Sequence, residues 1–236
     1  MTEVSMQRLD KFLSEAGVAS RKELKQLIRS GAVCVDGIVQ RDPEMKIDEL
    51  SAQVNVNGTA VTGYHKLTVM LHKPAGYVTA ADDPKEKTVM ELLPHEIRLL
   101  KVMPVGRLDK MTEGLLLFTN DGDLAHRLIS PKFEVNKVYY AEHEGKATQE
   151  DIHAFAAGLT LSDGTVCKKA ELAIISDGRC YVTVREGKYH QVRRMLASRG
   201  LPVTYLRRER EGGLELGDLP LGACRILKEN EIEMLL

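Results

Sequence analysis

At 236 residues, with 43% hydrophobic and 28% charged residues, the chain has the length of one domain or an unequal pair and the composition of a folded protein. The formal net charge of −1 argues against a general polyanion binder, because nonspecific nucleic-acid binding needs lysine and arginine to neutralise phosphates. No apolar run reaches the roughly 18 residues of a membrane helix and no signal peptide begins the chain, so a cytoplasmic location is expected.

The first predicted elements are two short helices. Apolar residues recur at helical spacing from Leu9 to Ala16, and Gly17 supplies a left-handed stop. A second helix is predicted after the capping box Ser20–Glu23, with its own apolar stripe and an end at Gly31. Two short amphipathic helices must pack on another element to be stable.

Two hairpins are predicted next. The alternating segment Val33–Val39 is interrupted by Asp36-Gly37, a pair typical of tight hairpin turns. Strands at Val54–Val56 and Thr59–Val61 are joined across Asn57-Gly58 in the same way. Together with the helices they predict a compact unit over residues 1–62.

The second predicted helix carries a basic face. Arg21, Lys25 and Arg29 are four residues apart, so they lie on one side of the helix, with Lys22 beside them. Charge alone favours a solvated surface.

Three segments of this unit, Arg8–Leu13, Ser20-Arg21 and Gly31–Gly37, resemble the S4 RNA-binding domain over its full length. The resemblance implies that the helices and the following loop present basic side chains to structured RNA. The RNA-binding candidates it implies are Arg8, Lys11, Arg21, Lys22, Lys25 and Arg29.

The rest of the chain, residues 63–236, predicts an α+β domain on a mostly antiparallel mixed sheet. No glycine-rich phosphate loop opens a helix, so a dinucleotide or nucleoside-triphosphate fold has no support. The predicted strands are Leu67–His72, Gly114–Thr119, Lys137–His143, Glu171–Ile175, Cys180–Arg185, Pro202–Leu206 and Leu214–Leu216. The predicted helices are Asp123–Ile129, Gln149–Ala157 and His190–Arg199.

The densest candidate for chemistry is the loop that precedes the strand at Gly114. It holds Arg107 and Asp109 and leads directly into a buried apolar strand, which would present both side chains rigidly at a cleft. Spacing alone does not make Asp109 catalytic, since a loop aspartate is more often a turn former or an ion-pair partner.

The segment Gly106–Leu117 reads Gly-Arg-Leu-Asp-x-x-Thr-x-Gly-Leu-Leu-Leu and resembles the signature of the ribosomal small-subunit pseudouridine synthase family. Lys73–Tyr77, Lys137–Tyr139 and Glu186–Met195 match further segments of that family in order. The resemblance implies that a uridine already in RNA loses its bond from N1 to the sugar C1′, turns, and is rejoined through C5. No cofactor takes part.

The resemblance also assigns roles. Asp109 would act as a nucleophile at the sugar or as a base at C2′, two routes that stay open. Arg193 would pair with this aspartate, and Tyr139 would stack on the uracil and assist proton loss from C5. Arg107 would fill the gap left by the extruded base. The remaining RNA-binding candidates are Lys188, His190, Gln191 and Arg194, although a histidine at a helix start is more often structural or a phosphate donor.

Residues 185–210 hold eight basic residues against two acidic ones, a local charge of +6, and form a candidate phosphate-binding segment. Just beyond, Glu211 stands where the family usually has an apolar residue, which puts the packing near the last strands in question.

The expected partner is small-subunit (16S) ribosomal RNA or a small-subunit assembly intermediate, bound by a monomer and away from any membrane. The motivating residues are Tyr189 and His190, where large-subunit relatives usually have Asn-Arg. One alternative is a large-subunit (23S) enzyme. The other is a catalytically silent assembly factor, and the presence of Asp109, Tyr139 and Arg193 argues against this second alternative. An enzyme acting on free nucleotides would need no S4 unit.

Neither a metal site nor a disulfide framework is expected. The four cysteines contain no Cys-x-x-Cys pair, and no histidine and cysteine cluster has metal-ligand spacing. Free or buried thiols are predicted at Cys34, Cys167, Cys180 and Cys224.

Overall fold

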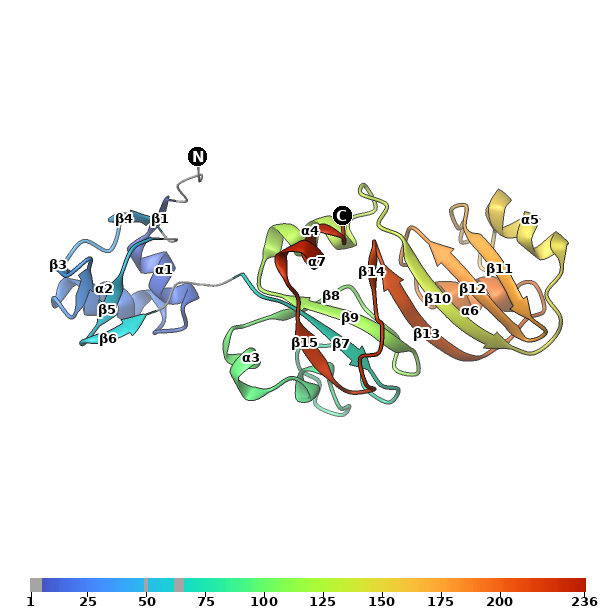
Figure 1. Ribbon diagram of the computed structural model, residues 1–236, viewed down its shortest axis with the longest axis horizontal. Coiled ribbons are helices and arrows are strands. Elements are labelled where there is room, and N and C mark those ends of the chain that lie inside the picture. Colours follow the sequence, from blue (N-terminus) through green and yellow to red (C-terminus); the bar gives the residue numbers. More distant parts are fainter. Residues whose placement is uncertain (1–5, 49–50, 62–65) are drawn as a thin grey trace. The chain divides into compact units, whose positions relative to one another are not determined.

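The computed structural model describes residues 6–48, 51–61 and 66–236. Its contacts divide the chain into two compact units, residues 1–66 and 67–236 (Figure 1). The boundary predicted between residues 62 and 63 lies outside the described residues. In the part of the chain that is described, no helix is long and apolar enough to cross a membrane.

The N-terminal unit packs two helices on a small antiparallel sheet. The helices are α1 (Leu9–Glu15) and α2 (Arg21–Arg29). The sheet has the order β3-β2-β5-β6, with β2 at Val33–Val35, β3 at Ile38–Gln40, β5 at Val54–Val56 and β6 at Thr59–Val61. Apolar residues of both layers form one core, which includes Phe12, Leu24 and Val33. The predicted elements of this unit are confirmed.

Local chemistry explains why these elements begin and turn where they do. Ser20 and Glu23 form the predicted capping box at the start of α2. In both turns, Asp36-Gly37 and Asn57-Gly58, the first residue has a φ of 50° and the glycine a φ of 80°. A tight two-residue hairpin turn requires two such left-handed residues. A further pair, β1 (Met6–Arg8) with β4 (Lys46–Asp48), was not predicted, since three residues are too few to show alternation.

The second unit is built on one nine-stranded sheet with the path β11-β12-β10-β13-β9-β7-β15, to which β14 adds on β13 and β8 on β9. All pairings are antiparallel except that of β13 with β9. The α+β fold with a mostly antiparallel mixed sheet is therefore confirmed. The strands are β7 (Thr68–Lys73), β8 (Met103–Val105), β9 (Glu113–Thr119), β10 (Lys137–His143), β11 (Glu171–Ser176), β12 (Arg179–Val184), β13 (Val203–Glu211), β14 (Leu214–Glu215) and β15 (Cys224–Ile226).

The parallel seam between β9 and β13 depends on one glycine. Gly114 lies opposite Arg208, and a Cβ at Gly114 would stand 2.2 Å from the Arg208 carbonyl oxygen. Only glycine allows this close approach of the two backbones. The two halves of the sheet can therefore join directly beside the loop that ends at β9.

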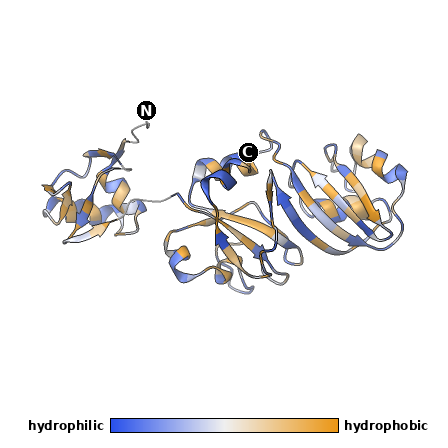
Figure 2. Cartoon of the chain, in the orientation of Figure 1, coloured by the Kyte–Doolittle hydropathy of each residue, from blue (hydrophilic) through white to orange (hydrophobic). Residues whose placement is uncertain are grey.

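Helices and loops cover both faces of β9. Leu115 and Leu117 belong to a core shared with α4 (Gly122–Ile129), while Leu116 and Phe118 belong to a core on the opposite face. This burial explains the continuous apolar run of the strand, which is orange along β9 in Figure 2. The remaining helical segments are η1 (Val89–Leu92), α3 (His95–Leu99), α5 (Gln149–Ala157), α6 (Gln191–Ala197) and α7 (Glu229–Glu233).

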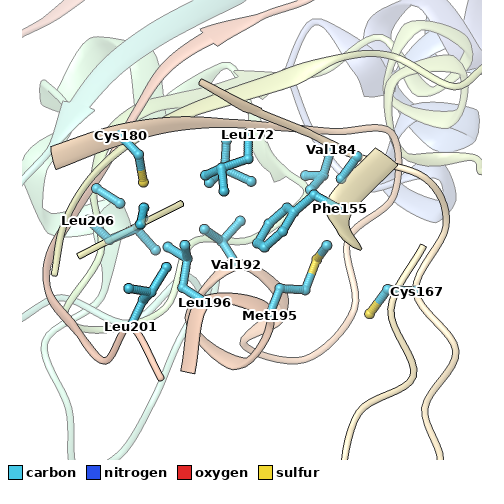
Figure 3. Packing of buried hydrophobic residues seen from close by; sticks show 14 of the residues in the cluster. Phe155, Cys167, Leu172, Cys180, Val184, Val192, Met195, Leu196, Leu201 and Leu206 are labelled. Carbon is cyan, nitrogen blue, oxygen red and sulfur yellow. The ribbon is translucent and has the colours of Figure 1, made fainter. Parts of the chain in front are cut away.

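The other half of the sheet has one apolar face, which α5 and α6 cover. Phe155 of α5 and Val192 and Met195 of α6 pack with Leu172 and Cys180 of the strands (Figure 3). Because α6 is anchored in this core, the turn that leads into it is held at a defined place.

The main departure from the predicted elements is β13. We expected a strand ending at Leu206, but β13 continues through a highly charged stretch to Glu211. The reason is that Arg208 and Glu211 are both 1% exposed and lie together inside the domain. The short elements η1, α3, β8, β15 and α7 were not predicted either, because three to five residues carry no measurable period.

Candidate active site

Three of the four segments that resemble the synthase family, all but Lys73–Tyr77, contribute to one hollow of about 210 Å³. Its walls come from the loop before β9, from Tyr139 on β10 and from the turn Glu186–Val192 that leads into α6. Arg107, Asp109 and Thr112 are the loop residues that line it. Residues about eighty positions apart in the sequence therefore meet in this hollow. The Asp109 side chain is one-third exposed there.

The loop backbone is held by Lys73, which sequence analysis placed in a matching segment but not among the site residues. Its side chain is fully buried, and Nζ donates hydrogen bonds to four carbonyl oxygens, those of Pro74, Asp109, Lys110 and Thr112, at 2.9–3.2 Å. Burial lowers the pKa of Lys73 to about 8. Lys73 thus fixes the loop on both sides of Asp109.

The His190 side chain lies against the Asp109 carboxylate. Its Nε2 lies 3.5 Å from Asp109 Oδ1, an ion pair when the imidazole is protonated. The backbone of His190 is left-handed, with φ of 48°, and its ring stacks on Tyr189 at a centroid distance of 4.0 Å. We predicted His190 as an RNA-binding residue, and the structure also places it against the candidate catalytic group.

Arg193 differs from its prediction. No ion pair joins it to Asp109 in the described ranges, and it instead donates to the carbonyl oxygens of Val203 and Met111, at 3.3 and 3.1 Å. Burial lowers the pKa of Arg193, and the charge of Asp109 partly offsets this effect. The predicted ion pair is not formed in this structure, where the guanidinium binds backbone carbonyls and ties the loop to β13.

Tyr139 lines the hollow and packs between two of the buried cores. Burial raises the pKa of Tyr139, and the nearby Arg208 guanidinium offsets only part of this rise. The phenol is thus held neutral, which suits a ring that stacks on a base better than a group that accepts a proton. Thr112 also faces the hollow, and within the described residues its buried Oγ1 has no hydrogen-bond partner.

Behind Tyr139 lies a buried group of charges. Arg208 Nε donates to the Leu115 carbonyl oxygen at 2.7 Å, and its Nη2 lies 3.2 Å from Glu211 Oε2. Lys137 Nζ lies 3.5 Å from the other oxygen of Glu211. Burial alone would lower the pKa of Arg208, but Glu211 and Tyr139 raise it. Glu211, unexpected at an apolar position, is the counter-ion of the buried Arg208 and of the partly buried Lys137.

The basic segment 185–210 is less available to phosphate than its charge suggests. Arg194 pairs with Asp163 at 2.5 Å, Arg199 with Asp151 at 2.7 Å and Arg185 with Glu171 at 3.3 Å. Carboxylates outside the segment therefore neutralise much of the predicted +6, and Arg208 is buried.

Three more of the predicted RNA contacts have defined surroundings. Lys188 lies 3.6 Å from Glu186 and donates to the Val166 carbonyl oxygen. Gln191 is 5% exposed and donates to Glu186 at 2.8 Å, so it holds the turn and does not reach solvent. Arg107, by contrast, is exposed at the rim of the hollow.

The basic face of the N-terminal unit forms as predicted. Arg21, Lys22 and Lys25 are exposed and line a shallow hollow, and Arg29 is exposed at the end of the same helix. Arg8 lines this hollow too, but it pairs with Asp10 at 2.8 Å and with Glu44. In a second pair, Lys11 lies 3.7 Å from Glu15. Arg8 and Lys11 are therefore partly neutralised.

The four cysteines are free thiols, as predicted. In the ranges that the structure covers, no group of three or more histidine, cysteine, aspartate or glutamate side chains could hold a metal ion.

A unit with an exposed basic helix, followed by a mixed-sheet domain with an aspartate in a hollow, is the arrangement expected of an RNA-modifying enzyme. Residues 67–198 match the RNA pseudouridylate synthase family, and residues 7–54 match the S4 domain. The chain belongs to the RNA pseudouridine synthase family and carries an N-terminal S4 domain.

Relatives agree with this assignment along nearly the whole chain. Ribosomal small subunit pseudouridine synthase A of Vibrio cholerae is 38% identical over 95% of this chain and 97% of its own. Ribosomal large subunit pseudouridine synthase B of Bacillus subtilis is 37% identical over 98% of this chain and 96% of its own. A crystal structure of a pseudouridylate synthase, 32% identical, covers 97% of this chain and 99% of its own with a TM-score of 0.69.

Proposed function

We propose that this RNA pseudouridine synthase isomerises one uridine of small-subunit (16S) ribosomal RNA, with Asp109 as the reacting carboxylate. The observation that carries the proposal is the hollow in which Asp109 meets Tyr139 and the Tyr189-His190 pair. A uridine stacked in RNA cannot reach such a recessed group, so the base is extruded into the hollow. Arg107, exposed at the rim, fills the space that the base leaves.

The chemistry then needs one carboxylate and a rigid loop. On the nucleophilic route, Asp109 forms a bond to C1′ as the bond from N1 breaks, and C5 of the rotated uracil later displaces the carboxylate. On the other route, Asp109 takes a proton from C2′ and returns it after C5 has joined C1′. On both routes C5 finally loses its proton to solvent and N1 takes one up from solvent, so the product is an isomer of the uridine, and both routes use an ionised Asp109.

The side chains around Asp109 support these roles. Lys73 and Arg193 hold the loop through its carbonyl oxygens, so Asp109 does not have to be ordered during the reaction. Tyr139 offers a neutral ring against which the uracil stacks.

The choice of 16S RNA rests on Tyr189 and His190. Tyr189 is 72% exposed, and the stacked pair lies at the Asp109 end of the hollow, where nucleotides flanking the target would pass. The similarity to small-subunit and large-subunit enzymes is nearly equal, at 38% and 37% identity, and does not decide the target. We further propose that the protein acts as a cytoplasmic monomer, with an S4 domain that ends near residue 62.

The test is to incubate the purified protein with 16S RNA, 23S RNA and partly assembled particles of each subunit, and to map pseudouridine. The Asp109→Asn variant provides the inactive control. We expect modification of one uridine in 16S RNA or a small-subunit particle. Modification confined to 23S RNA would overturn the target, and no modification of any RNA would overturn the activity.

A further inference from the structure

An exposed aromatic patch lies at the end of α4 and on the turn that follows it, outside the roles assigned above. Phe133 is 42% exposed and Ile129 is 55% exposed, although both are large apolar side chains. Two cations lie against the Phe133 ring, Arg127 at 5.8 Å and Lys132 at 6.0 Å from its centroid. His126 contacts the same ring edge-on at 6.3 Å. We call His126, Arg127, Ile129, Lys132 and Phe133 the Phe133 patch.

A second hollow, lined by Ile129 of this patch, borders the candidate active site. It has a volume of about 260 Å³ and shares Arg107, Tyr139, Glu186 and Gly187 with the Asp109 hollow. Its far wall is the end of α4 and the turn after it, including Ile129 and the two residues that follow. The two hollows are therefore neighbours, and the second one extends from the candidate active site as far as Ile129 of the Phe133 patch.

Charge in this region favours a polyanion. Arg107, Arg127 and Lys132 make no ion pair in the described part of the chain. Two of the carboxylates in this region are already engaged, since Glu134 pairs with Lys168 at 2.7 Å and Glu186 accepts from Gln191 at 2.8 Å. Their charges therefore repel a phosphate less than unpaired carboxylates would.

An exposed ring between unpaired cations suits a nucleotide better than a protein surface. Bases stack on aromatic side chains in single-stranded RNA, while lysine and arginine meet the adjacent phosphates. An apolar protein segment would instead have to desolvate Arg127 and Lys132 without giving them partners.

We propose that the Phe133 patch binds a nucleotide flanking the extruded uridine, with its base against Phe133 and its phosphate near Arg127 and Lys132. The inference rests on the proposed function insofar as it takes RNA as the substrate. It adds a subsite that positions the RNA beside Asp109 and leaves the bond exchange itself unchanged.

The experiment compares the full-length parent with Phe133→Leu, Phe133→Tyr and Lys132→Gln. RNA affinity is measured by filter binding as a function of salt, and kcat and KM by tritium release from 5-tritiated uridine RNA. Controls are Leu221→Ala, an exposed apolar residue on another loop, and Lys146→Gln, an exposed lysine elsewhere. Thermal unfolding of each variant checks that it folds.

For Phe133→Leu we expect Kd and KM to rise at least about fivefold, the lower end for loss of one base stack, with kcat nearly unchanged. Phe133→Tyr should restore parental values because a tyrosine ring also stacks. Lys132→Gln should reduce the slope of log Kd against log salt by about 0.7, the value for one contact to a single strand. The two controls should match the parent.

Parental Kd, KM and salt slope in both Phe133→Leu and Lys132→Gln would overturn this subsite. Because binding is measured without turnover, the two proposals fail separately. If the parent shows no activity but Phe133→Leu still weakens RNA binding, the proposed function is contradicted and the subsite is supported.

Discussion

Replacing Glu211 by leucine removes a buried carboxylate from between Arg208 and Lys137. Arg208 and Glu211 are each 1% exposed, and the carboxylate oxygens lie 3.2 Å from Arg208 and 3.5 Å from Lys137. Solvent cannot screen the charges that remain, so we expect a loss of about 3–5 kcal/mol in the free energy of unfolding. At about 2–4 °C per kcal/mol for a domain of this size, Tm should fall by roughly 6–20 °C.

Calorimetric unfolding of the full-length protein measures this effect, with Glu215→Leu as the matched control. Glu215 is exposed on the neighbouring strand, and its replacement should change stability by no more than about 0.5 kcal/mol. The double variant Arg208→Met with Glu211→Leu should be more stable than Glu211→Leu alone, because it removes one of the two uncompensated charges. A Tm for Glu211→Leu at or above that of the parent would refute the reasoning, and would indicate that an apolar residue suits this position.

Three further predictions concern catalysis, RNA affinity and the loop. Asp109→Asn should abolish tritium release from 5-tritiated uridine RNA and leave folding and RNA affinity nearly intact, and equal activity of the variant and the parent would rule out the assigned role. Neutralising Arg21, Lys25 and Arg29 together should weaken RNA binding and flatten its salt dependence by a little under one unit of slope per lost phosphate contact, which filter binding at several salt concentrations measures. Lys73→Met should lower kcat, because the loop loses four hydrogen bonds, and it should also change the dependence of stability on pH. Burial lowers the pKa of Lys73 from 10.5 to about 8, so between pH 8 and pH 10.5 the unfolded chain keeps a proton that the native protein has released. The free energy of unfolding of the parent, relative to that of Lys73→Met, should therefore increase as the pH is raised through this range, which urea titrations measure. A constant difference across that range would contradict this assignment.

Much of the fold could be predicted because its causes are local. The Asn57-Gly58 turn, the capping box at Ser20 and the strand β10 depend on residues only a few positions apart, and each lies where it was predicted. The same holds for the loop around Asp109, whose apolar continuation into β9 marks a strand buried on both faces.

The sequence by itself determined which residues could carry chemistry, and the tertiary structure decided what each of them contacts. Arg193 and Arg208 both belong to the basic segment 185–210, and their sequence neighbours do not distinguish their roles. In the structure, Arg193 donates to the carbonyl oxygen of Met111, whereas Arg208 is buried against Glu211 and Leu115. Lys73 could not be identified as the residue that holds the loop, because the carbonyl oxygens it binds lie as far away as Thr112. Local sequence specifies charge and period, but a counter-ion or a hydrogen-bond acceptor brought near by strand pairing depends on how the whole sheet is assembled.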